Sequence, residues 1–171
     1  MHAKNRKILV LVEETYEELE LHYPKLRMME AGAHVTVAGA EKDKIYKGKY
    51  GYPCKADVAF EEVDPKAFDA LIIPGGYAPD KLRKIPAVLN ITRAMHKENK
   101  WIAFICHAGW VPISAQVLKG VRCTSYEAIK DDMINAGANW VDEPVVIDGH
   151  FISSRFPGDL PQFCEAIVQN L

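Results

Sequence analysis

The sequence predicts a three-layer α/β fold in which helices cover both faces of a mostly parallel sheet. Two observations lead to this prediction. Short apolar runs recur along the chain, and stretches with helical periodicity separate them. The length of 171 residues suits one domain, and no linker, repeat or low-complexity tract divides the chain. We therefore expect a single domain over residues 1–171.

The first half of the chain is expected to alternate strands with helices around one irregular segment. Apolar runs predict strands at 7–12, 34–39 and 69–74. Between the first two strands, four apolar residues fall near one helical face and an Ala-Gly pair ends the helix. These four residues are Leu19, Tyr23, Leu26 and Met29. Glycines and a proline within 45–60 favour short irregular strands or a hairpin, whose lysines we place on a solvated face.

The second half continues the same alternation. We expect helices at 86–96, 108–118 and 127–136, strands at 101–105 and 121–126, and a hairpin at 145–154. The last helix has the clearest pattern, because its apolar residues keep i, i+3, i+4, i+7 spacing. They are Leu160, Phe163, Cys164, Ile167, Val168 and Leu171.

Composition argues against several classes of function. Lys and Arg total 21 against 23 Asp and Glu, a formal charge of -2, which makes nucleic acid an unexpected partner. The apolar runs are far shorter than a membrane span of about 20 residues, and the first one is too short for a signal peptide. We expect a cytoplasmic protein with no membrane segment.

The four cysteines are isolated in sequence. Cys54, Cys106, Cys123 and Cys164 form no Cys-x-x-Cys pair and have no histidine at ligand spacing. We therefore expect no metal site and no disulfide framework. In a reducing compartment each would be a free thiol, usually a small buried side chain.

One cysteine stands at the position where an open parallel sheet binds ligands, beyond the carboxyl end of a strand. Cys106 follows the apolar run 101–105, and His107 with two small residues leads into a helix. This order resembles a strand–nucleophile–helix elbow, which exposes the thiol near free backbone N–H groups. His107 could activate the thiol if the turn brings the two side chains together. The alternative is that Cys106 simply ends a buried strand.

Two further loops beyond strand ends carry unusual residues. Gly75 and Gly76 after the strand at 69–74 form either a tight turn or a backbone approach to a reacting atom, with the Gly76 N–H as an oxyanion donor. This loop lacks phosphate-loop and dinucleotide fingerprints, so we expect no nucleotide cofactor, and no other cofactor is indicated.

The loop after the first strand is rich in glutamate. Most of these side chains are expected to lie on a wet face at the helix N-terminus. One of them could turn toward Cys106, where burial and like charge would keep its carboxyl protonated. The residues are Glu13, Glu14, Glu17, Glu18 and Glu20.

Taken together, these motifs resemble the PfpI/ThiJ superfamily, in its branch of PfpI-type intracellular cysteine proteases and deglycases. The resemblance covers essentially the whole chain and implies a flavodoxin-like fold shared with class I glutamine amidotransferases. The residues that carry it are Tyr16-Glu17-Glu18-Leu19-Glu20-Leu21, Pro74-Gly75-Gly76 with Ala78-Pro79, Ile105-Cys106-His107, and Thr124-Ser125-Tyr126 through Lys130-Asp131-Asp132.

The resemblance also implies roles for individual residues. Cys106 matches the nucleophile, His107 its partner, and Glu17 the acid that hydrogen-bonds the thiol. Gly76 and His107 match the backbone oxyanion donors. Tyr126 matches a residue close to the pocket.

The third catalytic carboxylate of PfpI-type proteins comes from a neighbouring subunit and matches Asp80. The resemblance therefore implies a homo-oligomer, a dimer or a trimer of dimers.

The chain departs from the family pattern at two places. Asp80 stands where the family typically has Glu, and its side chain is one methylene shorter, which puts a complete triad in doubt. After the histidine the chain has Ala108-Gly109-Trp110 where many relatives have Gly-Pro. Trp110 either lines the pocket or packs under the sheet, and its helical position slightly favours packing.

The leading functional prediction is a cysteine-dependent hydrolase with Cys106 as nucleophile. Its substrate would be a peptide or amide bond, or an adduct of methylglyoxal or glyoxal on a protein or a small molecule. The sequence does not choose between peptidase and deglycase. The alternative is a non-catalytic redox or stress sensor that works through oxidation of Cys106.

Overall fold

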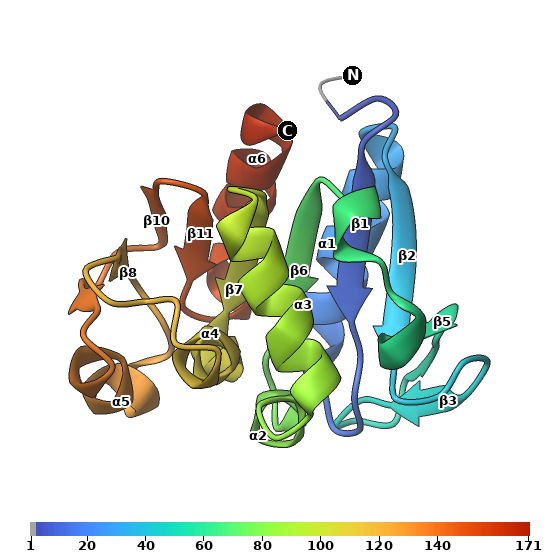
Figure 1. Ribbon diagram of the computed structural model, residues 1–171, viewed down its shortest axis with the longest axis horizontal. Coiled ribbons are helices and arrows are strands. Elements are labelled where there is room, and N and C mark those ends of the chain that lie inside the picture. The colour runs from blue at the N-terminus through green and yellow to red at the C-terminus, as the bar shows by residue number, and fades with distance from the viewer. Residues whose placement is uncertain (1–2) are drawn as a thin grey trace.

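A seven-stranded sheet forms the centre of the computed structural model, which describes residues 3–171 (Figure 1). The strand order is β10-β11-β7-β6-β1-β2-β5, and every neighbouring pair is parallel except β10 and β11. The strands are β1 (Lys7–Leu11), β2 (His34–Gly39), β5 (Val58–Ala59), β6 (Ala70–Ile73), β7 (Trp101–Ile105), β10 (Val145–Asp148) and β11 (Phe151–Ser154). The structure confirms the mostly parallel sheet.

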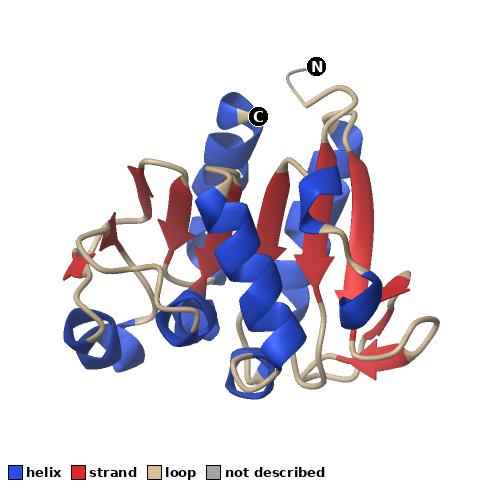
Figure 2. Ribbon diagram, viewed as in Figure 1, coloured by secondary structure: helices blue, strands red, loops and turns tan. Residues whose placement is uncertain are grey.

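Helices cover both faces of this sheet, as the sequence predicted (Figures 1 and 2). In the view of Figure 1, α3 crosses in front of the sheet and α1 lies behind it. Helices α1 and α6 pack against each other, and α3 packs against α4. The α-helices are α1 (Glu18–Glu30), α2 (Ala78–Leu82), α3 (Pro86–Lys97), α4 (Trp110–Ser114), α5 (Lys130–Asn135) and α6 (Leu160–Asn170).

The apolar runs form strands because both faces of the sheet are covered. All four residues of β6 and the last four of β1 and β7 are buried, which fits the unbroken apolar sequence of central parallel strands. Helix α6 buries the face that its spacing predicted, and Leu171, which follows the helix, is half-buried. The carboxyl ends of β1, β6 and β7 therefore meet at one rigid edge.

Helix α1 forms where the periodicity predicted it, but its apolar stripe faces outward. Leu19, Tyr23, Leu26 and Met29 are all more than 40% exposed, whereas Glu20, Leu21, Pro24 and Met28 are the buried residues. Both sets have helical spacing, so periodicity alone could not decide which one faces the sheet. The helix also runs through Pro24 and begins at Glu18.

The segment after β7 is less regular than expected. The predicted helix at 108–118 divides into a 3-10 turn, η3 (Cys106–Gly109), and the short α4, and the chain turns at Gln116 with φ +61°. The predicted strand at 121–126 shrinks to β8 (Arg122–Cys123), which pairs with β9 (Asn139–Trp140) outside the main sheet. The predicted helix at 127–136 begins as the 3-10 turn η4 (Glu127–Ile129).

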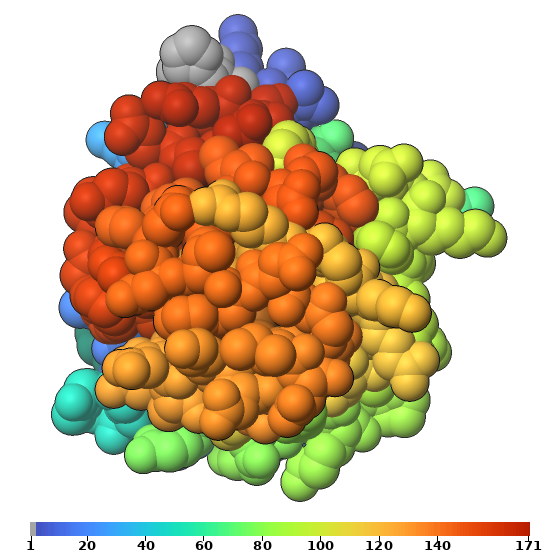
Figure 3. Space-filling model, turned by 90° about the vertical axis from the view of Figure 1, so that its left-hand side faces the viewer, coloured from blue at the N-terminus to red at the C-terminus, as the bar shows by residue number. Residues whose placement is uncertain are grey.

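This irregular segment covers one end of the molecule. In Figure 3 its orange surface spreads over the side of the molecule that carries the β10 edge of the sheet. Tyr126, just after β8, donates its backbone N–H to the carbonyl oxygen of Cys106 at 3.1 Å. The chain therefore leaves regular structure where it approaches the end of β7.

The remaining elements are short. A two-stranded hairpin, β3 (Ile45–Lys47) with β4 (Pro53–Lys55), confirms the irregular strands predicted within 45–60. The 3-10 turns η1 (Phe60–Glu62) and η2 (Pro65–Ala67) precede β6, and η5 (Pro157–Asp159) precedes α6.

Candidate active site

Cys106 occupies a sharp turn at the carboxyl end of β7. Its φ is +64°, in the left-handed region that non-glycine residues rarely adopt, at a cost of about 1–2 kcal/mol. The preceding residue, Ile105, is still extended. The backbone thus reverses direction within one residue, which has the geometry of the elbow that the sequence predicted.

A pocket of about 320 Å³ opens beside this turn. The side chains around it come from the start of α1, the β3–β4 turn and the loops after β6, β7, β8 and β11. Its lining residues are Glu17, Glu20, Lys49, Gly76, Tyr77, Cys106, His107, Tyr126, Phe156 and Pro157. The pocket therefore lies at the carboxyl edge of the sheet, where ligands bind in this class of fold.

The turn brings His107 to the thiol. Its Nδ1 lies 3.2 Å from the Sγ of Cys106, although neighbouring side chains of an extended strand point to opposite faces. The ring of Tyr126 stacks on the imidazole with centroids 5.1 Å apart. Burial lowers the pKa of His107, so the ring is neutral near pH 7 and can accept a proton from sulfur.

The carboxyl group nearest Cys106 belongs to Glu20 and not to Glu17, the residue that the family resemblance implies. Glu20 is fully buried, and its Oε2 accepts the Gly75 N–H at 2.8 Å. Its Oε1 makes no hydrogen bond to other groups of residues 3–171, and the carboxyl lies close enough to the Cys106 thiol for each group to shift the pKa of the other.

Glu17 has another local role, although it also lines the pocket. It is the N-cap of α1, and its Oε2 accepts the backbone N–H of Glu20 at 2.9 Å. A capping side chain turns back onto the end of its own helix, which leaves the residue one turn later to face inward. The available sequence signal was the position of Glu20 between two leucines within the predicted helix.

Burial sets the protonation of this pair. It raises the pKa of Glu20 to about 8, and the nearby Glu17 charge acts in the same direction. Burial also raises the pKa of the Cys106 thiol, while the backbone N–H groups of His107 and Gly76 oppose that rise by donating to sulfur. Glu20 is therefore largely protonated near pH 7, and a protonated carboxyl can donate a hydrogen bond to a thiolate.

The two glycines of the β6 loop have different positions. The Gly75 N–H is used by Glu20, and a Cβ at Gly75 would lie 2.7 Å from the Cβ of Cys106. Gly76 has φ +76°, and a Cβ there would lie 2.4 Å from the backbone N of Glu17. Of the two, Gly76 lines the pocket, and its N–H faces the sulfur. Gly75 is buried against Glu20 and Cys106.

Asp80 and Trp110 lie outside the pocket lining. Asp80 is an exposed residue of α2, and within residues 3–171 its side chain forms no hydrogen bond or ion pair with His107. Its delivery from a neighbouring subunit stays a prediction. The Trp110 indole donates to Asp132 at 2.9 Å, and the guanidinium of Arg83 lies over its ring. This arrangement agrees with packing, although the ring edge also lies beside His107.

Lys49 is the main pocket residue that the sequence analysis placed elsewhere. The sequence predicts a solvated hairpin face for it, but in the structure it lines the pocket. Its backbone N–H donates to Tyr16 at 2.9 Å, and the next residue, Tyr50, donates to the Glu18 carboxylate at 2.6 Å. These bonds fold the hairpin turn over the start of α1. Phe156 and Pro157 were also missed, because only tertiary structure brings them to the pocket.

Within residues 3–171, no three histidine, cysteine or acidic side chains are grouped so that they could hold a metal ion. In the same part of the chain, no helix has the length and apolar character needed to cross a membrane.

Comparison with known proteins places this site in a family. The family model described as DJ-1/PfpI matches residues 6–170. The chain belongs to the DJ-1/PfpI family. Its flavodoxin-like α/β fold agrees with the solved structures of that family.

Individual DJ-1/PfpI proteins are similar over nearly their full length. Deglycase PfpI of Pyrococcus furiosus is 48% identical over 165 residues, which are 96% of this chain and 99% of that protein. General stress protein 18 of Bacillus subtilis is 38% identical over 160 residues, 92% of this chain and 93% of that protein. The crystal structure of DJ-1beta from Drosophila melanogaster superposes with a TM-score of 0.92 at 29% identity, covering 98% of this chain and 90% of that one.

Proposed function

We propose that this protein is a cysteine-dependent hydrolase in which Cys106 is the nucleophile. The observation that carries the proposal is the left-handed turn at Cys106, which brings the thiol to 3.2 Å from His107 at the mouth of a pocket. A packed structural cysteine needs neither the strained backbone nor the neighbouring base.

The arrangement supports a two-step reaction. The Nδ1 of neutral His107 takes the thiol proton, and the sulfur forms a bond to the electrophilic carbon of the substrate. The electron pair of the attacked carbonyl moves to its oxygen, which the N–H groups of Gly76 and His107 stabilise. His107 then returns the proton to the leaving group, and water releases the acyl group from sulfur. Protonated Glu20 stabilises the thiolate before attack and after release.

The substrate class we favour is an adduct of methylglyoxal or glyoxal on an amino-acid side chain. This preference rests on relatives named deglycases and on a pocket of about 320 Å³, which suits a small adduct. The adduct carbon is tetrahedral, so it first loses the amine or thiol and regenerates the aldehyde, whose carbonyl carbon Cys106 attacks. A proton shift between the two neighbouring oxygenated carbons of the resulting hemithioacetal gives an acyl thioester, which water releases as the hydroxy acid. Both substrate classes thus lead to an acyl thioester on Cys106. Peptide or amide cleavage is therefore the second candidate for the same residues.

We further propose that Asp80 of a neighbouring copy orients His107. Asp80 is exposed on α2 and carries no role within its own chain's pocket. An inactive Asp80→Ala protein mixed with an inactive Cys106→Ala protein should then recover activity, because mixed oligomers contain some complete sites. A mixture that stays inactive after subunit exchange would contradict supply from a second copy.

Parallel assays of the wild type and Cys106→Ala test the central proposal. One substrate is a methylglyoxal–thiol adduct and the other a fluorogenic peptide amide. We expect loss of at least about 10³-fold in activity on the true substrate. Cys123→Ala is the matched control and should retain activity, because Cys123 is buried away from the pocket.

Retention of both activities in Cys106→Ala would refute the mechanism. The alternative role as a redox sensor makes a different prediction for the wild type. It requires stoichiometric oxidation of Cys106 to sulfinate by peroxide with no turnover of either substrate. His107 at hydrogen-bonding distance favours the hydrolase, since a sensor does not need a base.

A further inference from the structure

A second, smaller cavity adjoins the catalytic pocket. It has a volume of about 170 Å³ and shares two walls with that pocket, the rings of Tyr126 and Phe156. We call it the annex. Trp140, Glu127, Asp142 and Arg155 line its other sides. When one group of a substrate fills the catalytic pocket, the group next to it in the substrate can therefore reach the annex.

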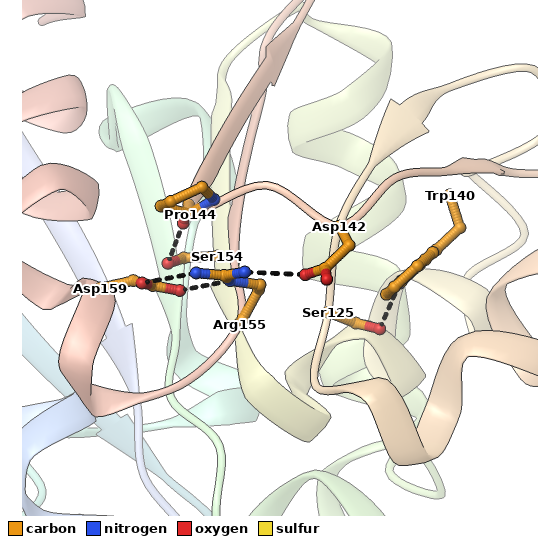
Figure 4. Close-up of polar contacts among 7 residues, drawn as sticks. All are labelled: Ser125, Trp140, Asp142, Pro144, Ser154, Arg155 and Asp159. Carbon is orange, nitrogen blue, oxygen red and sulfur yellow. Dashed lines mark hydrogen bonds and ion pairs between the residues drawn. The ribbon is translucent and has the colours of Figure 1, made fainter.

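Arg155 joins the walls of the annex, and the hydrogen bonds of its side chain go to carboxylates of the protein. Its Nε and Nη2 donate to the two carboxylate oxygens of Asp159 at 2.8 and 3.1 Å, and its Nη1 donates to Asp142 at 2.8 Å (Figure 4). The guanidinium also lies over the Phe156 ring at 4.8 Å. Two carboxylates already neutralise this cation, so Arg155 offers no free positive charge to an anionic ligand.

The charge that remains in the annex is negative. Arg155 and the buried Asp159 form one neutral bidentate pair. The remaining carboxylates, Asp142 and Glu127, outnumber by one the other cation beside the annex, Lys130 over the Trp140 ring. Asp142 is 68% exposed and engages Arg155 through only one of its oxygens. Glu127 is exposed, and its side chain forms no ion pair with any part of residues 3–171.

The aromatic walls also favour cations. The ammonium of Lys130 lies over the Trp140 ring at 5.0 Å, just as the Arg155 guanidinium lies over Phe156. The Trp140 indole is fixed by its hydrogen bond to Ser125 at 2.9 Å, shown in Figure 4. Two rings of the annex thus already hold positive groups of the protein, and two carboxylates stand beside them.

We propose that the annex is a substrate subsite for a basic side chain, the guanidinium or ammonium of a residue next to the one that reacts at Cys106. The proposal rests on the proposed function, because it places the reacting group in the catalytic pocket. Glu127 and Asp142 would attract the cation, and the aromatic walls would cover its apolar stem. Arg155 acts as a positioning residue that keeps Asp142 and Phe156 in place.

Equilibrium binding separates this subsite from the chemistry. Two acetylated tripeptide amides with a central alanine are compared, one flanked by arginines and the other by citrullines, which have nearly the same shape without the charge. Affinities for the Cys106→Ala protein are measured by calorimetry at low ionic strength. We expect the arginine peptide to bind about tenfold more tightly, with this advantage falling about threefold in each of Glu127→Gln and Asp142→Asn.

A matched control lies on the same loop. Glu143 is paired with Arg122 and does not line the annex, so Glu143→Gln should keep the full arginine advantage. In the wild type, the arginine peptide should also protect Cys106 from iodoacetamide more strongly than the citrulline peptide does. That protection would place the bound peptide across both compartments.

Equal affinities for the two peptides would overturn the subsite, and so would an arginine advantage that survives the Glu127→Gln/Asp142→Asn double variant. A change of oligomeric state in that double variant would overturn it too, by showing that this face contacts another copy of the chain. Failure of the proposed function gives a different result. Hydrolysis would then persist in Cys106→Ala, and the affinity comparison would still decide the annex.

Discussion

Cys106 and Cys123 offer an instructive comparison, because both are buried cysteines at the carboxyl ends of strands. Cys106 is 8% exposed and Cys123 is fully buried, and burial raises the thiol pKa of both, that of Cys123 to about 12. Only Cys106 has a positive φ, a histidine nitrogen at 3.2 Å and a place in the pocket lining. Burial therefore does not distinguish a reactive thiol from a packed one, whereas backbone geometry and neighbouring groups do.

The largest expected difference between the two thiols is in their rates of alkylation. Cys123 can react only when the structure opens, whereas Cys106 faces a pocket with a base beside it. We expect iodoacetamide to label Cys106 at least about 10³-fold faster than Cys123 at neutral pH. Mass spectrometry of peptides from a time course measures both rates. In denaturant the two rates should converge, and similar rates in the native protein would remove the distinction.

The pH dependence of stability tests the environment of Cys106. The pKa of Glu20 is raised from 4.5 to about 8 on folding, so between these values the folded chain holds a proton that the unfolded chain has lost. This stabilisation is full below pH 4.5 and is lost as the pH rises toward 8.

Glu20→Gln removes this ionisation. Between pH 4.5 and 8, its free energy of unfolding should therefore rise relative to that of the wild type by roughly 3–4 kcal/mol. Urea denaturation at a series of pH values measures the difference. Glu17→Gln is the comparison variant. We expect it to cost about 1 kcal/mol through loss of the helix cap and to retain a smaller pH dependence than the wild type, because the Glu17 charge contributes to the raised pKa of Glu20. A pH-independent gap between wild type and Glu20→Gln would contradict a protonated, buried Glu20.

The loop opposite Cys106 provides a steric test. Gly76 and Gly120 have similar backbone angles, φ +76° and +79°, but a Cβ at Gly120 meets no atom within 4 Å. We expect Gly76→Ala to lower the free energy of unfolding by about 2–3 kcal/mol and Gly120→Ala by about 1 kcal/mol. Thermal unfolding of both variants measures the two losses. Equal losses would show that the approach of Gly76 to Glu17 is relaxed in solution.

The smallest effect concerns backbone strain alone. At Cys106 the left-handed φ favours glycine, so Cys106→Gly should be more stable than Cys106→Ala by about 1 kcal/mol. At Cys123, within β8, the order should reverse by a similar amount, because glycine weakens a strand. Denaturant midpoints of the four variants decide this, and the same order at both sites would refute the strained turn.

The elements that depend on local pattern could be predicted from the sequence. The central strands, α3 and α6 carry their own periodicity, and the order Ile105-Cys106-His107 indicated the turn before its φ was known. The outward face of α1 could not be predicted, because two helical stripes compete on one helix and only packing against the sheet decides between them. Strand β8 is shorter than predicted because the chain after it turns toward Cys106, where the Tyr126 N–H donates to the Cys106 carbonyl. This contact is also a tertiary effect.

The same limit applies to the site. Cys106, His107 and Gly76 are identified by their positions directly after strands, which a sequence displays. Choosing Glu20 over Glu17 depends on which of them caps α1, a difference of one helical turn within a run of glutamates. Lys49 and Phe156 reach the pocket through the hairpin turn and the loop after β11, and nothing in their local sequence marks them.

The hydrogen bond from the Tyr126 N–H to the Cys106 carbonyl has a mechanical consequence. It ties the wall between the two compartments to the strained residue itself, so a ligand that pushes Tyr126 aside also pulls on the backbone of the nucleophile. Variation in the loop after β8 therefore cannot reshape substrate selection without altering how the thiol is presented. One backbone hydrogen bond thus joins the residue that separates the two compartments to the residue that carries the thiol.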